Sequence, residues 1–540
     1  MAVYAPMVVA VAVGSRPAIG LDCSDNEGEF MNPIELGIFS SRIESVCEEM
    51  GAMLRRAAFS PNIKDRLDFS CAVFDRDGGL SAQAAHIPVH LGSMAYAMAD
   101  IVAGIDWQPG DMVVLNDPYK GGTHLPDITV VAPVFAADQL LAFVANRAHH
   151  ANVGGSTPGS MPISNHLEDE GIVISPTHIV TEGELVSAVV EKLSQGNMQA
   201  RGDFAAQISA NRAGVIRLQA LIEQFGVANY QGYLDGLNEY GRKLAASSLQ
   251  AIPAGVYQYE DYLDDDGQGN QRIKIKVAIH VSSEQKVRVD FTGTDPQVAG
   301  NINCPISVAA AAVYYVFRCL MPDQTPACAG TFSVIDVVAP QGCLLNANYP
   351  AAVAAGNVET STRAVDVVLG ALAQAIPERV PAASHGSMNN VAMGADASGQ
   401  QPRWDYYETI GGGMGASRSH HGTSAVQTHM TNTLNTPIES LELHYPLRVT
   451  QYAVRRGSGG SGEQRGGDGI VRELTFLAPA QVTLLTERRT LAPWGIGNGQ
   501  PGERGANYLN DQPLAGKVQL RANSNDRLRI ETPGGGGYSS

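Results

Sequence analysis

The chain has 540 residues, a formal net charge of −17, and 44% hydrophobic and 17% charged residues. This composition is too apolar for a disordered chain, and its apolar runs are too short to span a bilayer. Strong acidity argues against nucleic acid or an anionic membrane as partner, since both favour a basic surface. We therefore expect a soluble, cytoplasmic, globular protein with more than one domain.

The first half of the chain alternates between helical and β-like patterns. Residues 1–30 differ from the rest and are interpreted as a disordered N-terminal extension. From Glu35 to Phe59 apolar residues recur at helical spacing, which ends before Pro61 because a proline disfavours helix in the preceding residue. Short β-like runs bounded by turn residues follow at 69–74, 112–115, 128–135 and 140–145.

Helical spacing returns over residues 203–250, as one long helix or two shorter ones, and stops at Pro253. We predict that residues 31–252 form a mixed α/β region that carries the site discussed below. Residues 253–345 are predicted to be mainly antiparallel β, because apolar and polar residues alternate at 273–279 and 287–291.

The last region, residues 346–540, is rich in glycine and is predicted to be rich in strands. Helices are expected at 307–320 and 362–376, and strands near 470–477, 481–486 and 526–531. The closing run of glycines, Gly534 to Gly537, is interpreted as a flexible tail. The predicted fold class is α+β, with mixed helices and antiparallel sheets and a β-rich C-terminal half.

Histidines and carboxylates are concentrated in one window of the sequence. Six of the 13 histidines fall between His86 and His166, and Asp68, Asp117 and Asp127 lie within or just before this window. Neutral imidazoles with one carboxylate suit zinc, manganese or ferrous iron and leave positions open for water. The seven cysteines include no C-x-x-C pair, which argues against a cysteine zinc site. The window therefore predicts a divalent metal site.

Among the histidines, His124 lies in a glycine-containing loop whose backbone can approach a bound group closely. His149 and His150 end an apolar strand, and adjacent strand residues face opposite sides, so only one of them is expected to face a shared site. Either could be a ligand on this reasoning.

The other candidates have ordinary explanations. His86 and His90 flank Pro88, which argues against a helix there, and both are expected to be surface or hydrogen-bonded residues, as is His166. Asp68, like Asp117, could equally cap a turn.

Two well-known motifs occur only in incomplete form. Residues 411–416 satisfy G-x-G-x-x-A, but no helical pattern follows on which a pyrophosphate could rest. Residues 459–463 lack the last glycine of a G-x-S-x-G elbow. The sequence contains no G-x-x-x-x-G-K-[ST], so ATP, if used, would have to be bound by another chain.

Several phrases resemble, in the same order, the hydantoinase B and 5-oxoprolinase family. They are SPNIKDRLDFS (60–70), HIPVHLGSM (86–94), NDPYKGGTHLPD (116–127), GNVETS (356–361), SAVQTHMTNT (424–433) and TPGGGGY (532–538). The resemblance covers about residues 31–538. The chain departs from the family pattern over Pro162–Glu170, after Gly159-Ser160-Met161, which suggests a different substrate.

The resemblance implies a B-type subunit of a hetero-oligomer that opens a cyclic amide, such as a hydantoin, a lactam or 5-oxoproline, while an A-type subunit binds ATP. It also implies a metal, zinc or manganese, held by one aspartate and two histidines, which we place on Asp68, His124 and His149, with His150 as the alternative. Asp127 or Asp117 is then the expected general base.

The implied chemistry is coherent. An unstrained amide carbonyl resists water, so phosphorylation of its oxygen on the partner creates a leaving group, and the metal supplies the nucleophile by activating water. Two alternatives stay open at this point: a subunit of an ATP-dependent carboxylase of acetone or acetophenone, and a non-catalytic scaffold subunit.

Overall fold

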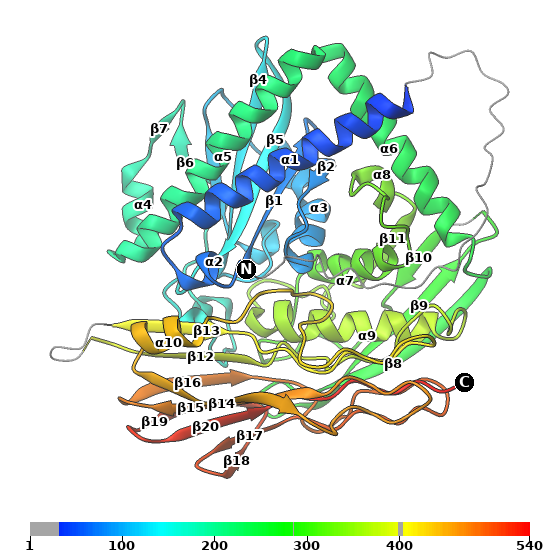
Figure 1. Cartoon of the computed structure of the whole chain (residues 1–540). Helices are drawn as coiled ribbons and strands as arrows, with labels where there is room; N and C mark the ends of the chain where they lie inside the picture. Colours follow the sequence, from blue (N-terminus) through cyan, green and yellow to red (C-terminus); the bar gives the residue numbers. More distant parts are fainter. Residues whose placement is uncertain (1–31, 285, 398–402) are drawn as a thin grey trace.

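The computed structural model describes residues 32–284, 286–397 and 403–540, so the predicted N-terminal extension, residues 1–30, lies outside the described residues. The predicted α+β class is confirmed (Figure 1): helices and largely antiparallel sheets alternate, and strands dominate the C-terminal part. None of the helices in these ranges combines the length and apolar character needed to cross a bilayer.

The first sheet is antiparallel throughout, with strand order β2-β1-β5-β4-β3-β6-β7. Its strands are β1 (Phe69–Asp75), β2 (Leu80–Gln83), β3 (Met112–Leu115), β4 (Asp127–Ala136), β5 (Gln139–His149), β6 (Thr177–Thr181) and β7 (Glu184–Leu185). The central strands β4 and β5 are almost entirely buried, because helices cover both faces of the sheet.

Helices of the N-terminal part pack on both sides of this sheet. They are α1 (Pro33–Ala57), α2 (Pro61–Lys64), α3 (Pro88–Ala103), α4 (Ser187–Ser194), α5 (Met198–Phe225) and α6 (Val227–Leu249). Cys71 and Val73 of β1 belong to the core shared with α1 and α5, whereas Ala72 and Phe74 face α3. The period-2 alternation of a strand thus serves two apolar layers.

The prediction against a helix at His90 was wrong. Pro88 occupies the first turn of α3, where a missing N–H costs nothing because it would lack a helical partner in any case. His86 therefore precedes the helix and His90 lies in its first turn, so the two do not share a strand face as expected.

The second sheet has the order β11-β10-β9-β8, and only its β10–β11 pair is parallel. Its strands are β8 (Gly255–Asp265), β9 (Gln271–Val281), β10 (Val287–Asp290) and β11 (Ile335–Val338). The accompanying helices are α7 (Ile306–Cys319), α8 (Ala329–Phe332) and α9 (Ser361–Leu372), and α9 is directly preceded by a π-helical turn, η4 (Gly356–Thr360). Helix α9 is buried along its whole length between β8, β9 and α7.

Two antiparallel sheets form the C-terminal layers seen at the bottom of Figure 1. One contains β12 (Asn390–Ala395), β13 (Trp404–Glu408), β16 (Ala480–Leu485) and β19 (Lys517–Ala522). The other contains β14 (Leu447–Arg455), β15 (Gly469–Phe476), β17 (Ala506–Leu509), β18 (Gln512–Leu514) and β20 (Arg527–Glu531). Their inner faces share one apolar core, and the short helix α10 (Ile438–His444) packs at its edge.

The closing glycines are not a flexible tail. Gly534 to Gly537 are buried, and the N–H groups of Gly535 and Gly536 donate to the carbonyl oxygens of Gly467 and Ala383. A Cβ at Gly536 would lie 2.0 Å from the carbonyl oxygen of Trp494, so the run is glycine because backbones meet here at close range.

Candidate metal centre

Two histidines and an aspartate meet at the β4–β5 end of the first sheet. His124, Asp127 and His149 are buried, and one potential ligand atom of each lies within 4.8 Å of the others. Asp127 begins β4 and pairs directly with His149 at the end of β5, and its backbone N–H donates to the carbonyl oxygen of His124. A single antiparallel pair and the turn before it therefore assemble the group.

The distances within this group suit a divalent cation. Asp127 Oδ1 lies 3.2 Å from His124 Nε2 and 3.1 Å from His149 Nδ1. Bonds of about 2.1 Å to a common ion place neighbouring ligand atoms about 3.0 to 3.4 Å apart. The Nε2 atoms of both histidines are buried and make no hydrogen bond of normal geometry within the described part of the chain. Two imidazoles and one carboxylate thus fit zinc or manganese.

The second carboxylate oxygen of Asp127 is held from three directions. Oδ2 accepts hydrogen bonds from Thr123 Oγ1 at 2.8 Å and Asn357 Nδ2 at 3.1 Å, and it lies 3.1 Å from His90 Nε2. Such outer contacts fix the orientation of a metal-binding carboxylate and leave Oδ1 directed at the two histidines.

The two histidine rings are also oriented by their surroundings. His124 Nδ1 lies 3.1 Å from the carbonyl oxygen of Ala354, which can only accept, so Nδ1 carries the proton and Nε2 presents its lone pair. The His149 ring stacks on Tyr407, with ring centroids 4.6 Å apart and planes 14° from parallel. Both rings are therefore fixed before any ion binds.

The electrostatics of the group follow from burial and close contact. Burial by itself would raise the pKa of Asp127, but His124, His90 and the hydrogen bond from His149 hold it well below its ordinary value. Burial lowers the pKa of His149, which favours the neutral imidazole that a metal requires. Burial also acts to lower the pKa of His124, but the facing Asp127 reverses this and raises it.

The predicted ligand set Asp68, His124 and His149 is brought together only in part. The grouped carboxylate is Asp127, which the sequence had suggested as a general base. Asp68 lies further out, with Oδ2 3.6 Å from Arg66 and Oδ1 3.9 Å from the same His90 Nε2 that faces Asp127. Its backbone carbonyl accepts from the N–H of His149, so it adjoins the group without belonging to it.

The other candidates lie elsewhere. Asp117 caps the 3-10 turn Pro118–Lys120, where its side chain accepts from the Tyr119 N–H and from Ser175 Oγ. His150 points to the opposite face of the sheet, as expected from strand geometry, and its Nε2 lies 2.9 Å from Gln207 Oε1.

Three contacting residues were not singled out from the sequence as site residues. His90 had been assigned an ordinary role, although it faces Asp127. Asn357 lies in the GNVETS phrase, which was noted only as a family match, and reaches Asp127 through the π-helical turn η4. Nothing in the sequence around Tyr407 pointed to His149, because the contact joins β13 to β5.

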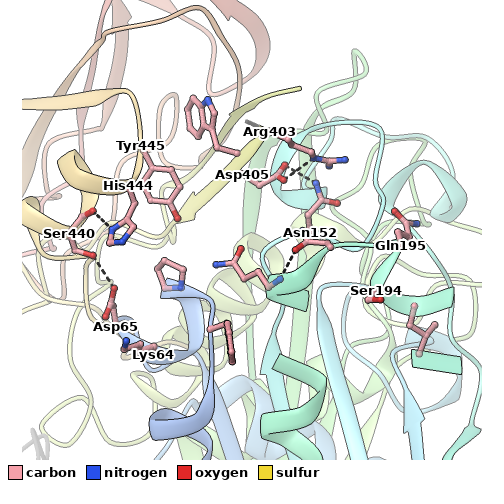
Figure 2. Close-up of a pocket in the computed structure, with 17 residues that line it drawn as sticks. Lys64, Asp65, Asn152, Ser194, Gln195, Arg403, Asp405, Ser440, His444 and Tyr445 are labelled. Atoms are coloured by element: carbon pink, nitrogen blue, oxygen red, sulfur yellow. Dashed lines mark hydrogen bonds and ion pairs between the residues drawn. The ribbon is translucent and has the colours of Figure 1, made fainter. Parts of the chain in front are cut away.

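An open cleft of about 650 Å³ lies beside this part of the molecule (Figure 2). Figure 2 shows Asn152 directed at Asp405, and Asp65 at Ser440, with hydrogen bonds of 2.8 and 3.2 Å. Asn152 follows β5, and Asp405 lies two residues before Tyr407 on β13. The cleft is thus built from segments that continue into the metal centre, although no candidate ligand lines it.

Comparison with known proteins agrees with this geometry. The family model for hydantoinase B/oxoprolinase matches residues 32–540. The chain belongs to the hydantoinase B/oxoprolinase family. The resemblance found in the sequence is therefore confirmed over nearly the whole chain.

Relatives within the hydantoinase B/oxoprolinase family differ in length. The 5-oxoprolinase 1 of Arabidopsis thaliana is 40% identical over 544 residues, which cover 94% of this chain and 42% of that protein. This chain thus spans about two fifths of such a relative. The putative B-type subunit of a D-/L-hydantoinase from a Pseudomonas species is 32% identical, and the match covers 94% of this chain and 90% of that one.

A solved structure shares the fold. The ATP-dependent caprolactamase of Pseudomonas jessenii superposes with a TM-score of 0.87 at 26% identity, covering 94% of this chain and 91% of that one. The layers described above are therefore those of a known fold in this family.

Proposed function

We propose that this chain is the metal-binding B-type subunit of an enzyme that opens a cyclic amide at the expense of ATP, and that a separate A-type subunit binds the nucleotide. The observation that carries the proposal is the buried group of His124, Asp127 and His149, with its orphaned imidazole nitrogens and its ligand-like spacing.

The proposed ligands are His124 Nε2, an imidazole nitrogen of His149 and Asp127 Oδ1. Asp127 replaces Asp68 in this set because its Oδ1 lies within 3.2 Å of both histidines. A divalent ion bound there would act as a Lewis acid and activate water for attack on a carbonyl carbon. Asp68 becomes the candidate for a proton-accepting role, since its carboxylate adjoins the group from the side of His90.

The residues around the ligands provide orientation and exclude bulk water. Thr123 and Asn357 occupy the outer oxygen of Asp127, so this oxygen cannot rotate toward the ion in place of Oδ1. The ring of Tyr407 covers one face of His149. Burial of all three ligands strengthens their electrostatic interactions and reduces the cost of reorganisation during a reaction.

The size of the chain and its relatives support the division of labour between two subunits. The chain matches the Pseudomonas hydantoinase relative over almost its full length but spans about two fifths of 5-oxoprolinase 1. Activation of the amide by ATP is therefore assigned to a partner, and ring opening to this chain. The hydantoinase and caprolactamase relatives favour a cyclic amide as the substrate class.

The test is co-production with an A-type subunit, followed by assays of ring opening with hydantoin, 5-oxoproline and caprolactam, each with and without ATP. We expect ATP-dependent ring opening of at least one of them, with one metal ion per chain by elemental analysis. A product that requires bicarbonate and a ketone would instead indicate a carboxylase. Absence of both metal and activity would support a scaffold role and contradict the proposal.

A further inference from the structure

One short buried segment, Val353–Asn357, contacts two of the proposed ligands from outside. The Ala354 carbonyl accepts from His124 Nδ1 at 3.1 Å, and Asn357 Nδ2 donates to Asp127 Oδ2 at 3.1 Å. These contacts set the ring plane of His124 and the rotation of the Asp127 carboxylate. The position of this segment therefore determines where two ligand atoms point.

A single carboxylate holds the segment in place. Glu170 is completely buried, and its Oε1 accepts from the N–H groups of Val353 and Ala354, both at 2.9 Å, and from Ser164 Oγ at 2.7 Å. Its Oε2 has no hydrogen-bond partner among the described residues. The same stretch of backbone thus links Glu170, through Ala354, to His124.

Packing alone does not explain a carboxylate at this position. A buried acid is costly unless it is paired with a cation, and the contacts above come from neutral donors. Burial accordingly raises the pKa of Glu170 to about 7. The residue also closes Pro162–Glu170, the stretch in which the sequence departs from its family pattern.

We propose that Glu170 is a positioning residue of the metal centre: by fixing the Val353–Ala354 backbone, it holds the carbonyl that orients His124 toward the ion. The inference rests on the proposed function, because it assumes that His124 binds a metal. A purely structural role for Glu170 would affect the stability of the fold and leave metal affinity unchanged.

The test compares Mn²⁺ binding by the full-length chain and its variants, with free Mn²⁺ followed by electron paramagnetic resonance. In Glu170→Ala the two backbone N–H groups lose their acceptor, and we expect affinity to fall about 10- to 100-fold, as for other outer contacts of metal ligands. Glu170→Gln keeps an acceptor oxygen, and its affinity should stay within about threefold of wild type. Glu168→Gln is the matched control, because Glu168 lies exposed in the same 3-10 turn.

A second readout separates positioning from stability. The absorption spectrum of the Co²⁺-loaded chain should change in Glu170→Ala, and it should be retained in Glu170→Gln and Glu168→Gln. If Glu170→Ala does not fold, Glu170→Asp provides the same test, because its shorter side chain cannot reach both N–H groups in the same geometry. A folded Glu170→Ala or Glu170→Asp variant with wild-type Mn²⁺ affinity would overturn the inference alone, whereas a wild-type chain that binds no Mn²⁺ would overturn the proposed function with it.

Discussion

Asp68 and Asp127 lie on either side of His90, and the identity of the metal-binding carboxylate depends on a few ångströms. Asp127 Oδ1 faces both histidines, whereas Asp68 is directed at Arg66 and His90. Their roles can be separated because either carboxylate can be changed to an isosteric amide.

We expect Asp127→Asn to weaken Mn²⁺ binding by at least about 100-fold, because it removes an anionic ligand from a site with only one such carboxylate. Asp68→Asn should weaken it by less than about tenfold, since Asp68 lies outside the group. Competition with a calibrated chelator measures both constants. Loss of metal in Asp68→Asn, with retention in Asp127→Asn, would restore the assignment made from the sequence.

Adjacent histidines on β5 provide an internal comparison. His124→Ala removes a proposed ligand and should leave less than one tenth of the wild-type metal content after dialysis. His150→Ala should retain full metal content and lose about 1–3 kcal/mol of unfolding free energy, because Gln207 Oε1 loses its buried partner. Elemental analysis and urea denaturation distinguish these outcomes, and full metal content in His124→Ala would reject it as a ligand.

At the scale of elements, helix α3 lies close to helix α7 because Gly92 has no side chain. A Cβ at Gly92 would lie 2.6 Å from Ala311 Cα on α7. Gly37 of α1, in contrast, has open space around its position. The two glycines therefore play different roles although both are helical.

Gly92→Ala should destabilise the protein by about 1–3 kcal/mol, since the two helices must separate. Gly37→Ala should stabilise it by about 0.5–1 kcal/mol, because alanine loses less backbone entropy in a helix. Thermal and urea unfolding of the two variants would show opposite shifts. Equal effects would mean that the close approach of α3 to α7 contributes little.

The regular elements were largely predictable from sequence, because their periodicity is local. The predicted helix from Glu35 corresponds to α1, and the helical stretch at 203–250 is divided at Gly226, where φ is +78°. Where a local signal has two meanings the prediction was wrong, as for Pro88, which begins a helix. The glycine run at 534–537 was misread because its packing partners are distant in sequence.

The candidate site was predictable only where the chain itself brings residues together. His124, Asp127 and His149 lie on one strand pair and its preceding turn, so the window was identified correctly. The choice of Asp68 over Asp127 could not be settled from sequence, because both are near His90 in space. Asn357 and Tyr407 come from other layers, and no local pattern indicates such contacts. The four-region division of the chain stays a prediction.

At the scale of the whole molecule, a line of hydrogen bonds joins the metal centre to the C-terminal sheets. Tyr407, whose ring stacks on His149, donates from its hydroxyl to Asn390 Oδ1 at 2.8 Å. Asn390 Nδ2 in turn donates to Glu359 Oε1 at 2.6 Å. Glu359 belongs to η4, the turn that also carries Asn357 to Asp127. Any charge on Glu359 is therefore buried where the layers meet.

This carboxyl gives the stability of the molecule a specific pH dependence. Burial and the nearby Glu487 raise the pKa of Glu359 from 4.5 to about 7 in the folded chain. The folded state therefore holds this proton more tightly than the unfolded state. The contribution is fully present below about pH 4.5 and is lost as the pH rises through about 7.

Glu359→Gln removes the titration while keeping an acceptor for Asn390 and for the Met388 N–H. Relative to this variant, the metal-free wild-type chain should lose on the order of 3 kcal/mol of unfolding free energy between pH 4.5 and pH 7, since one pKa unit corresponds to about 1.36 kcal/mol. Urea denaturation at half-unit pH steps measures the difference curve, and Glu378→Gln controls for loss of an exposed carboxylate. A difference that stays constant, or that rises in favour of wild type, would mean that Glu359 is ionised in the folded protein at acidic pH and that its surroundings compensate the buried charge.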